Sequence, residues 1–118
     1  MFIAYIIVAI LMAFVAIGSG VAKLQHNPRV VTGINGVIGV PMPWFPVLAA
    51  CEIAGALGIL IGIFWAPLGL AAAVGLVLYF VGAIVAHLRV RDFKGLGGPV
   101  LPLALAVATL VLRILSLK

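Results

Sequence analysis

The stretch from Val47 to Phe64, VLAACEIAGALGILIGIF, decides how the rest of the chain is interpreted. It is apolar enough to lie in a bilayer, yet it contains one carboxylate, Glu52. A carboxylate inside a membrane-spanning helix is costly, so it usually faces the interior of a helix bundle, pairs with a cation and marks a functional site. The stretch therefore predicts a transmembrane helix whose acid is turned toward basic residues on other helices.

The composition of the chain is typical of an integral membrane protein. Of its 118 residues, 67% are hydrophobic and 8% are charged, whereas a soluble domain averages about half and about a quarter. The length leaves room for several spans and short loops but not for a separate soluble domain, so we expect a single domain over residues 1–118.

The net charge of +5 comes from seven Lys and Arg residues and two acids. The bases lie between hydrophobic segments, which argues against a nucleic-acid partner and favours cytoplasmic loops in contact with anionic lipid headgroups. Taken singly, each base can equally be a topology signal and nothing more.

The apolar sequence divides into four segments. Residues 2–22 carry no charge and are long enough to cross a hydrocarbon core of about 30 Å. Three prolines between residues 41 and 46 end the first loop. The apolar run that follows, residues 47–86, is divided by a single predicted turn, Ala66-Pro67-Leu68-Gly69. We therefore predict an all-α, antiparallel four-helix transmembrane bundle with spans at about 2–22, 47–65, 69–87 and 100–116.

Small residues recur at intervals of three and four within the first two spans. Such stripes allow neighbouring helices to approach closely, and they fit internal packing as well as dimerisation. The residues concerned are Ala9, Ala13, Ala16 and Gly20, followed by Ala54, Gly58 and Gly62.

Basic residues set the expected orientation. Both long loops lie on one side of the membrane, and the turn on the other side has no base. The positive-inside rule therefore predicts that loops 23–46 and 88–99 are cytoplasmic and that both termini lie outside. Trp44 and Trp65 are expected at the two opposite interfaces.

The polar side chains converge on the loop side of the predicted bundle. Lys23 ends the first span, Glu52 lies about 8 Å into the second, at 1.5 Å per residue, and His87 ends the third. We expect a Lys23–Glu52 contact with His87 beside it, and we expect Arg89 and Asp92 to pair on the helix surface. The cluster is open to three interpretations: a structural clamp, a ligand site, or a site of proton or electron chemistry.

Several chemistries are excluded by the residues available. Cys51 is the only cysteine, so no disulfide forms within one chain, and we expect it to be a small packing residue. His26, His87, Glu52 and Cys51 show no metal-ligand spacing, so no metal site is expected. Neither a Ser-His-acid set nor a glycine-rich loop ending in Lys-Ser/Thr is present.

The chain resembles the DoxX-like family of small four-span membrane proteins. The matching motifs cover nearly the whole sequence: Gly20-Val-Ala-Lys23, Gly39-Val-Pro41, Glu52-Ile-Ala-Gly-Ala-Leu-Gly58 and His87-Leu-Arg-Val-Arg-Asp92. The resemblance implies that five residues are candidate site residues: Lys23, Glu52, His87, Arg89 and Asp92. The family takes its name from a membrane subunit of a thiosulfate–quinone oxidoreductase, but this chain lacks the cysteine pairs that would support sulfur oxidation.

The function expected from these observations is a bacterial inner-membrane binding or accessory subunit, with no activity of its own. Its polar pocket around Glu52 would hold a small hydrophobic molecule such as a quinone or a lipid. The alternative is a helper that packs against a partner membrane protein or a second copy through small-residue faces. A quinone-linked redox subunit and an ion or proton path through Glu52 remain further alternatives.

Overall fold

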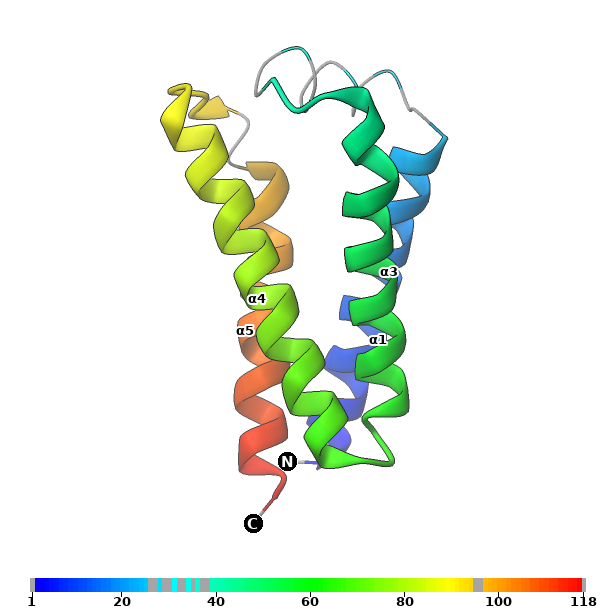
Figure 1. Cartoon of the computed structure of the whole chain (residues 1–118). Helices are drawn as coiled ribbons and strands as arrows, with labels where there is room; N and C mark the ends of the chain where they lie inside the picture. Colours follow the sequence, from blue (N-terminus) through cyan, green and yellow to red (C-terminus); the bar gives the residue numbers. More distant parts are fainter. Residues whose placement is uncertain are drawn as a thin grey trace.

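A computed structural model describes residues 2–25, 28, 31, 34, 36, 39–94 and 97–117. Within them the elements are α1 (Phe2–Leu24), the 3-10 turn η2 (Met42–Trp44), α3 (Phe45–Ile61), α4 (Ala66–Arg89) and α5 (Gly97–Leu115). Helices α1 and α4 each pack against both α3 and α5. Successive helices run in opposite directions, and both termini lie at the same end of the bundle (Figure 1). The predicted all-α antiparallel four-helix bundle is confirmed.

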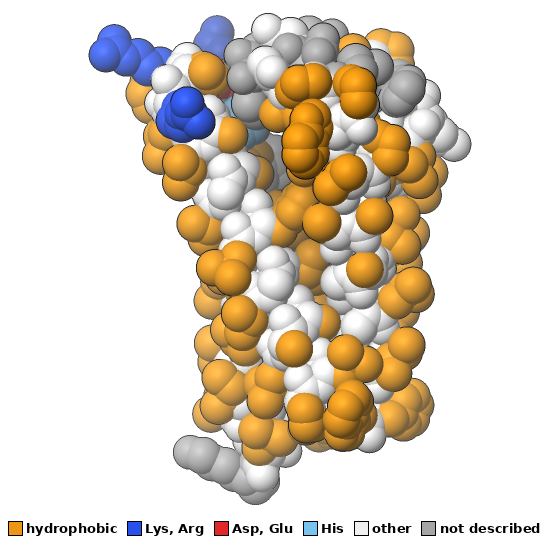
Figure 2. All heavy atoms as spheres, in the orientation of Figure 1, with side chains coloured by type: hydrophobic (Ala, Val, Ile, Leu, Met, Phe, Trp, Pro, Cys, Tyr) orange, Lys and Arg blue, Asp and Glu red, His pale blue; other side chains and the backbone are white. Residues whose placement is uncertain are grey.

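The helices are apolar enough for a multi-pass membrane protein. Helices α1, α4 and α5 each have the length and hydropathy to cross a bilayer, whereas α3 is shorter at 17 residues. Large apolar side chains cover the face of the bundle seen in Figure 2. Phe14 and Phe64, for example, are 78% and 91% exposed, which suits contact with lipid chains.

Pro46 and Pro67 lie inside the first turns of α3 and α4, which moves the predicted boundaries of these helices. Pro46 occupies the first turn of α3, so this helix begins at Phe45 and not at residue 47. Pro67 likewise occupies the first turn of α4, so the expected turn at 66–69 is the start of that helix. The chain reverses instead at residues 62–64, and α3 ends at Ile61. Proline is tolerated in a first turn because its missing N–H has no intrahelical acceptor there.

The last span also differs from its predicted bounds. Helix α5 runs from residue 97 to 115 and includes Pro102 in its interior. The apolar residues 37–40 predict that part of the first loop lies on the membrane surface or re-enters it shallowly, and Val37 and Ile38 of this stretch lie outside the described residues.

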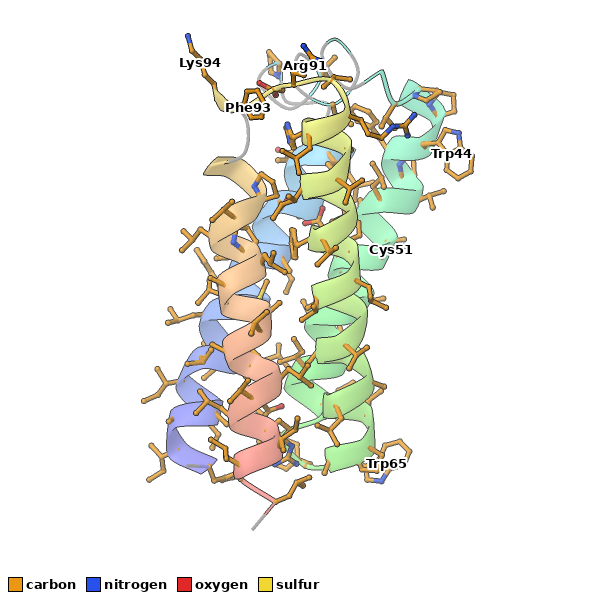
Figure 3. The ribbon with its side chains drawn as sticks, turned by 90° about the vertical axis from the view of Figure 1, so that its left-hand side faces the viewer. Trp44, Cys51, Trp65, Arg91, Phe93 and Lys94 are labelled. Carbon is orange, nitrogen blue, oxygen red and sulfur yellow. The ribbon has the colours of Figure 1, made fainter. Side chains whose placement is uncertain are left out.

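The small-residue stripe of α1 lies in the core. Ala9, Ala13 and Ala16 are almost fully buried and contribute to the main apolar cluster with Tyr5 and Met12. The tryptophans mark the two ends of the bundle: Trp44 lies near the loop end and Trp65 near the end that carries the termini (Figure 3). The bundle thus has a lipid-facing surface and an interior lined by small residues.

Candidate functional site

The Glu52 cluster, which we define as Ser19, Lys23, Glu52 and Tyr79, joins three helices inside the bundle. The Lys23 ammonium forms an ion pair with Glu52 Oε1 and also donates to Ser19 Oγ at 2.8 Å. The Tyr79 hydroxyl donates to the same Glu52 Oε1 at 2.6 Å. The expected Lys23–Glu52 contact is therefore present, and Tyr79 on α4 completes it.

Close contact between α1 and α3 brings Lys23 to Glu52. A Cβ atom placed on Gly20 would lie 2.8 Å from Ile53 Cγ1 and 3.3 Å from the Ala49 carbonyl. A larger residue at this position would force the Ile53 side chain to move, so the glycine allows the two helices to approach closely. Lys23 is one turn further along α1, so its side chain reaches the α3 carboxylate.

The seam between α3 and α4 brings Tyr79 to the same carboxylate. Moving away from the 62–64 turn, Gly62 faces Gly69, Gly58 faces Ala72, Gly55 faces Leu76 and Glu52 faces Tyr79. Each step of three or four residues on one helix is matched by a similar step on the other, as expected for an antiparallel pair. Side-chain size increases along the seam, from two glycines to Glu and Tyr.

The Glu52 side chain is fully buried and unequally satisfied. Oε1 accepts two hydrogen bonds, whereas Oε2 has no hydrogen-bond partner among the residues that the structure describes. The Lys23 ammonium also lies 6.0 Å from the centroid of the Tyr79 ring, within cation–π range. The Lys–Glu pair is neutral as a unit, which lowers the cost of placing both charges in an apolar bundle.

His87 and Asp92 form a separate pair at the end of α4. His87 Nδ1 lies 2.9 Å from Asp92 Oδ2, and within the described part of the chain no ion pair joins His87 to Glu52. The expected position of His87 beside the Lys23–Glu52 pair therefore stays a prediction. Helix α4 ends at Arg89, whose side chain is exposed, so the helical spacing assumed for an Arg89–Asp92 surface pair does not extend to Asp92.

A left-handed residue produces the His87–Asp92 contact. Arg91 has φ of 55°, and the Asp92 and Arg91 N–H groups donate to the carbonyls of His87 and Leu88. This is the Schellman arrangement that ends a helix. It folds Asp92 back over the last turn, where its carboxylate meets the imidazole. The His-Leu-Arg-x-Arg-Asp motif is therefore a helix-ending structure, distinct from the Glu52 cluster.

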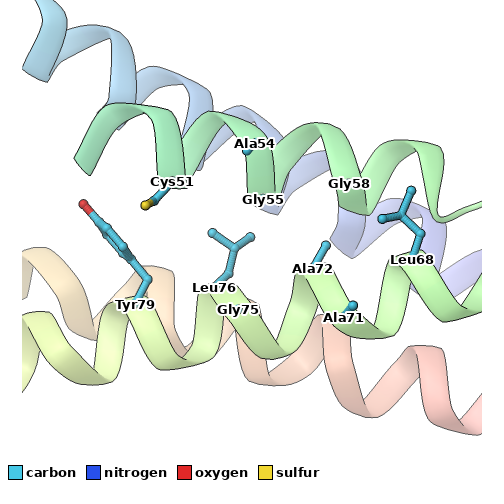
Figure 4. A pocket seen from close by; sticks show the side chains of 10 residues that line it. All are labelled: Cys51, Ala54, Gly55, Gly58, Leu68, Ala71, Ala72, Gly75, Leu76 and Tyr79. Atoms are coloured by element: carbon cyan, nitrogen blue, oxygen red, sulfur yellow. The ribbon is translucent and has the colours of Figure 1, made fainter. Parts of the chain in front are cut away.

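An apolar groove of about 540 Å³ lies on the outer side of the α3–α4 seam. Cys51 and Tyr79 approach each other from the two helices at one end of it (Figure 4). Cys51 is exposed, which contradicts its expected role as a packing residue. The lining residues are Cys51, Ala54, Gly55, Gly58, Leu68, Ala71, Ala72, Gly75, Leu76 and Tyr79.

Arg113 forms a second polar cluster, at the terminal end, which the sequence analysis missed. This arginine is buried and donates from Nη2 to the Gly62 carbonyl at 3.0 Å and from Nη1 to Ser116 Oγ at 3.1 Å. Its guanidinium carbon lies 5.5 Å and 4.9 Å from the ring centroids of Phe2 and Tyr5. A cation at a helix C-terminus interacts favourably with the helix dipole, so Arg113 stabilises the C-terminal end of α3.

Metal binding has no support in the described residues, where no three His, Cys, Asp or Glu side chains come together. The Glu52 cluster instead meets an apolar groove at Tyr79, which lines the groove and donates to Glu52. Such an arrangement can orient the polar end of a hydrophobic molecule.

Comparison with protein families confirms the resemblance inferred from the motifs. The model of the DoxX-like family matches residues 7–109, which include the Glu52 cluster, the His87–Asp92 pair and the groove. Neither the curated proteins nor the solved structures gave a match.

Proposed function

The chain belongs to the DoxX-like family, and on that premise we propose that it is a membrane subunit that binds a small hydrophobic molecule, a quinone or a lipid. The apolar body of the ligand lies in the α3–α4 groove, and its polar end lies toward the Glu52 cluster. The protein acts as a binding or accessory subunit without catalytic activity of its own.

The observation that carries this proposal is the meeting of a buried charged cluster with an open apolar groove. Tyr79 belongs to both, because it lines the groove and donates to Glu52. Ligand sites of this kind are mostly apolar and contain a few polar groups that fix orientation. The small lining residues leave room for a ligand in the groove, since a Cβ atom on Gly75 would meet nothing within 4 Å.

Filling the groove tests the proposal. Gly75→Leu places a large apolar side chain in the groove, and we expect at least a tenfold loss of co-purifying quinone or lipid, measured by mass spectrometry of gently purified protein. Gly82→Leu is the matched control, because Gly82 is exposed on the same helix, has equally open surroundings and lies outside the groove lining. Equal ligand content in both variants, or no ligand in the wild-type protein together with no thermal shift on adding quinones, would refute the proposal.

A second candidate function is that of a helper that packs against a partner membrane protein or a second copy. It is favoured by the exposed small residues Ala54, Ala71 and Gly75, which would let another helix approach the groove. Gly62 does not belong to such a surface, because it packs against Gly69 of α4, and Gly58 lines the groove but is buried against Ala72. If the helper function is correct, Gly75→Leu removes a stoichiometric protein partner in native membranes and leaves the lipid content unchanged.

We also propose the bacterial cytoplasmic membrane as the location, with loops 23–46 and 88–99 on the cytoplasmic side. Exposed Arg89, Arg91 and Lys94 lie at the loop end, and Figure 2 shows Lys and Arg side chains gathered there. At the terminal end, Arg113 is buried within the bundle, so the exposed positive charge of the described residues is concentrated on the loop side.

A further inference from the structure

The α3–α4 groove runs from the middle of the bundle to its terminal end. At 1.5 Å per residue, Tyr79 lies about 15 Å from the loop end of α4 and about 20 Å from its start. Cys51 lies about 9 Å from the start of α3 and about 15 Å from its end. These two side chains therefore form an inner end of the groove near mid-membrane, and Leu68 lines the opposite end, beside the 62–64 turn (Figure 4).

The polar atoms of the groove lie at its inner end. Among the side chains that line it, only those of Cys51 and Tyr79 contain a sulfur or an oxygen atom. None of the described residues that line the groove carries a charge. Toward the terminal end the lining consists only of small or aliphatic residues: Gly58, Leu68, Ala71 and Ala72.

This polarity is opposite to that of a phospholipid in the same leaflet. A phospholipid keeps its charged head group at the membrane surface, about 15 Å from the centre of a hydrocarbon core of about 30 Å. A charge at the centre of the bilayer is costly, and the lining of the groove provides no base to neutralise it. An uncharged polar group is less costly at that depth.

We propose that the groove selects an uncharged amphiphile, which binds with its polar head beside Cys51 and Tyr79 at mid-membrane and its apolar chain directed toward the 62–64 turn. The inference rests on the proposed function and adds the chemical class of the ligand. Quinones, quinols and prenols have such a head on an apolar chain. A phospholipid does not fit, because its head group would have to leave the membrane surface.

Three probes with the same aromatic ring and tail test the selection against charge. 4-Decylphenol is small and uncharged, 4-decylphenyl phosphate is charged, and 4-decylphenyl dimethyl phosphate has the same phosphorus group without the charge. Each is titrated against the full-length protein in nanodiscs and measured by native mass spectrometry. Binding in the groove is the part that Gly75→Leu removes and Gly82→Leu retains, because only Gly75 lines the groove. We expect both uncharged probes to bind there at least about tenfold more tightly than the charged one.

Photolabelling tests the orientation of the bound molecule. One decylphenol derivative carries a diazirine on its ring and another carries it at the end of its chain, and the labelled residues are identified by peptide mass spectrometry. We expect the ring to label α3 and α4 around Cys51 and Tyr79, and the chain end to label α4 around Leu68. In Cys51→Ala the ring should still label the Tyr79 region, which excludes a preference of the reagent for the thiol.

The outcomes separate the inference from the function on which it rests. Equal binding of the charged and uncharged probes in the groove overturns the inference, and so does a ring that labels the Leu68 region, but both results leave the binding of an apolar chain intact. Equally weak binding of the two phosphorus probes also overturns it, because the size of the head then decides. Absence of groove binding by all three probes counts against both the inference and the proposed function.

Discussion

Glu52 is tolerated inside the bundle because two other helices supply partners for one of its oxygens. Lys23 neutralises the charge and Tyr79 donates a hydrogen bond. Removing one member of a buried ion pair leaves an uncompensated charge, whereas replacing both members by neutral groups of similar size is much less costly.

This asymmetry predicts the result of a double-mutant cycle. We expect Lys23→Met alone to lower the free energy of unfolding by about 3–5 kcal/mol, and Glu52→Gln alone to lower it substantially, because Lys23 then stays charged and buried. The double variant should be less destabilised than the sum of the two. Equilibrium unfolding in mixed detergent micelles measures all four proteins, and strictly additive effects would contradict a buried pair.

The sequence predicted the Lys23–Glu52 contact but not the other residues that build the two clusters. Opposite charges in an apolar chain have few candidate partners, so their pairing follows from topology. Tyr79 resembles an ordinary core aromatic residue until α3 and α4 are placed in register across the 62–64 turn. In the sequence Arg113 resembles a terminal topology signal. Its acceptor is the Gly62 carbonyl, and a backbone acceptor cannot be identified from residue types alone.

At the scale of the elements, the α3–α4 seam controls where the groove and the Glu52 cluster lie. The helices are in backbone contact at Gly62 and Gly69, and larger side chains separate them toward Glu52. Hydropathy predicted that these helices are antiparallel neighbours, since the link between them is short. Their exact bounds were missed because a proline can end a helix or occupy its first turn, and the flanking sequence does not distinguish the two cases.

The seam predicts which glycines are essential for stability. A Cβ atom on Gly62 would lie 2.2 Å from Gly69 Cα, so we expect Gly62→Ala to lower the free energy of unfolding by about 1–3 kcal/mol through overpacking. Gly82→Ala meets nothing within 4 Å and should stay within about 1 kcal/mol of wild type. Thermal unfolding of both variants in detergent is the measurement, and similar midpoints would show that the two helices can separate freely at Gly62.

At the scale of the whole molecule, the two polar clusters lie at different ends of one apolar body. At the terminal end, Arg113 of α5 donates to the Gly62 carbonyl and Tyr5 of α1 donates to the Ile59 carbonyl at 3.2 Å, so both helices are joined to the end of α3. The Glu52 cluster lies toward the loop end, beside the groove. One end is thus held by contacts to the α3 backbone, whereas the other depends on side chains that meet across three helices.

Single cysteines at the two ends test the proposed orientation. In a Cys51→Ala background, which removes the exposed native thiol, Phe93→Cys should be protected from an impermeant maleimide in intact cells and Leu117→Cys should be labelled. Both positions are exposed, so access depends on the side of the membrane. The reverse pattern would invert the topology, because it would place the exposed arginines of the loop end outside.

The outward opening of the α3–α4 groove determines how an occupant would arrive. Its small lining residues Ala54, Ala71 and Gly75 are exposed on the surface of a multi-pass membrane protein, so a guest diffuses laterally through the hydrocarbon and does not cross from water. Saturation is then governed by the mole fraction of the guest in the bilayer. Occupancy should follow the lipid composition of the membrane and change little when more aqueous buffer is added at constant lipid.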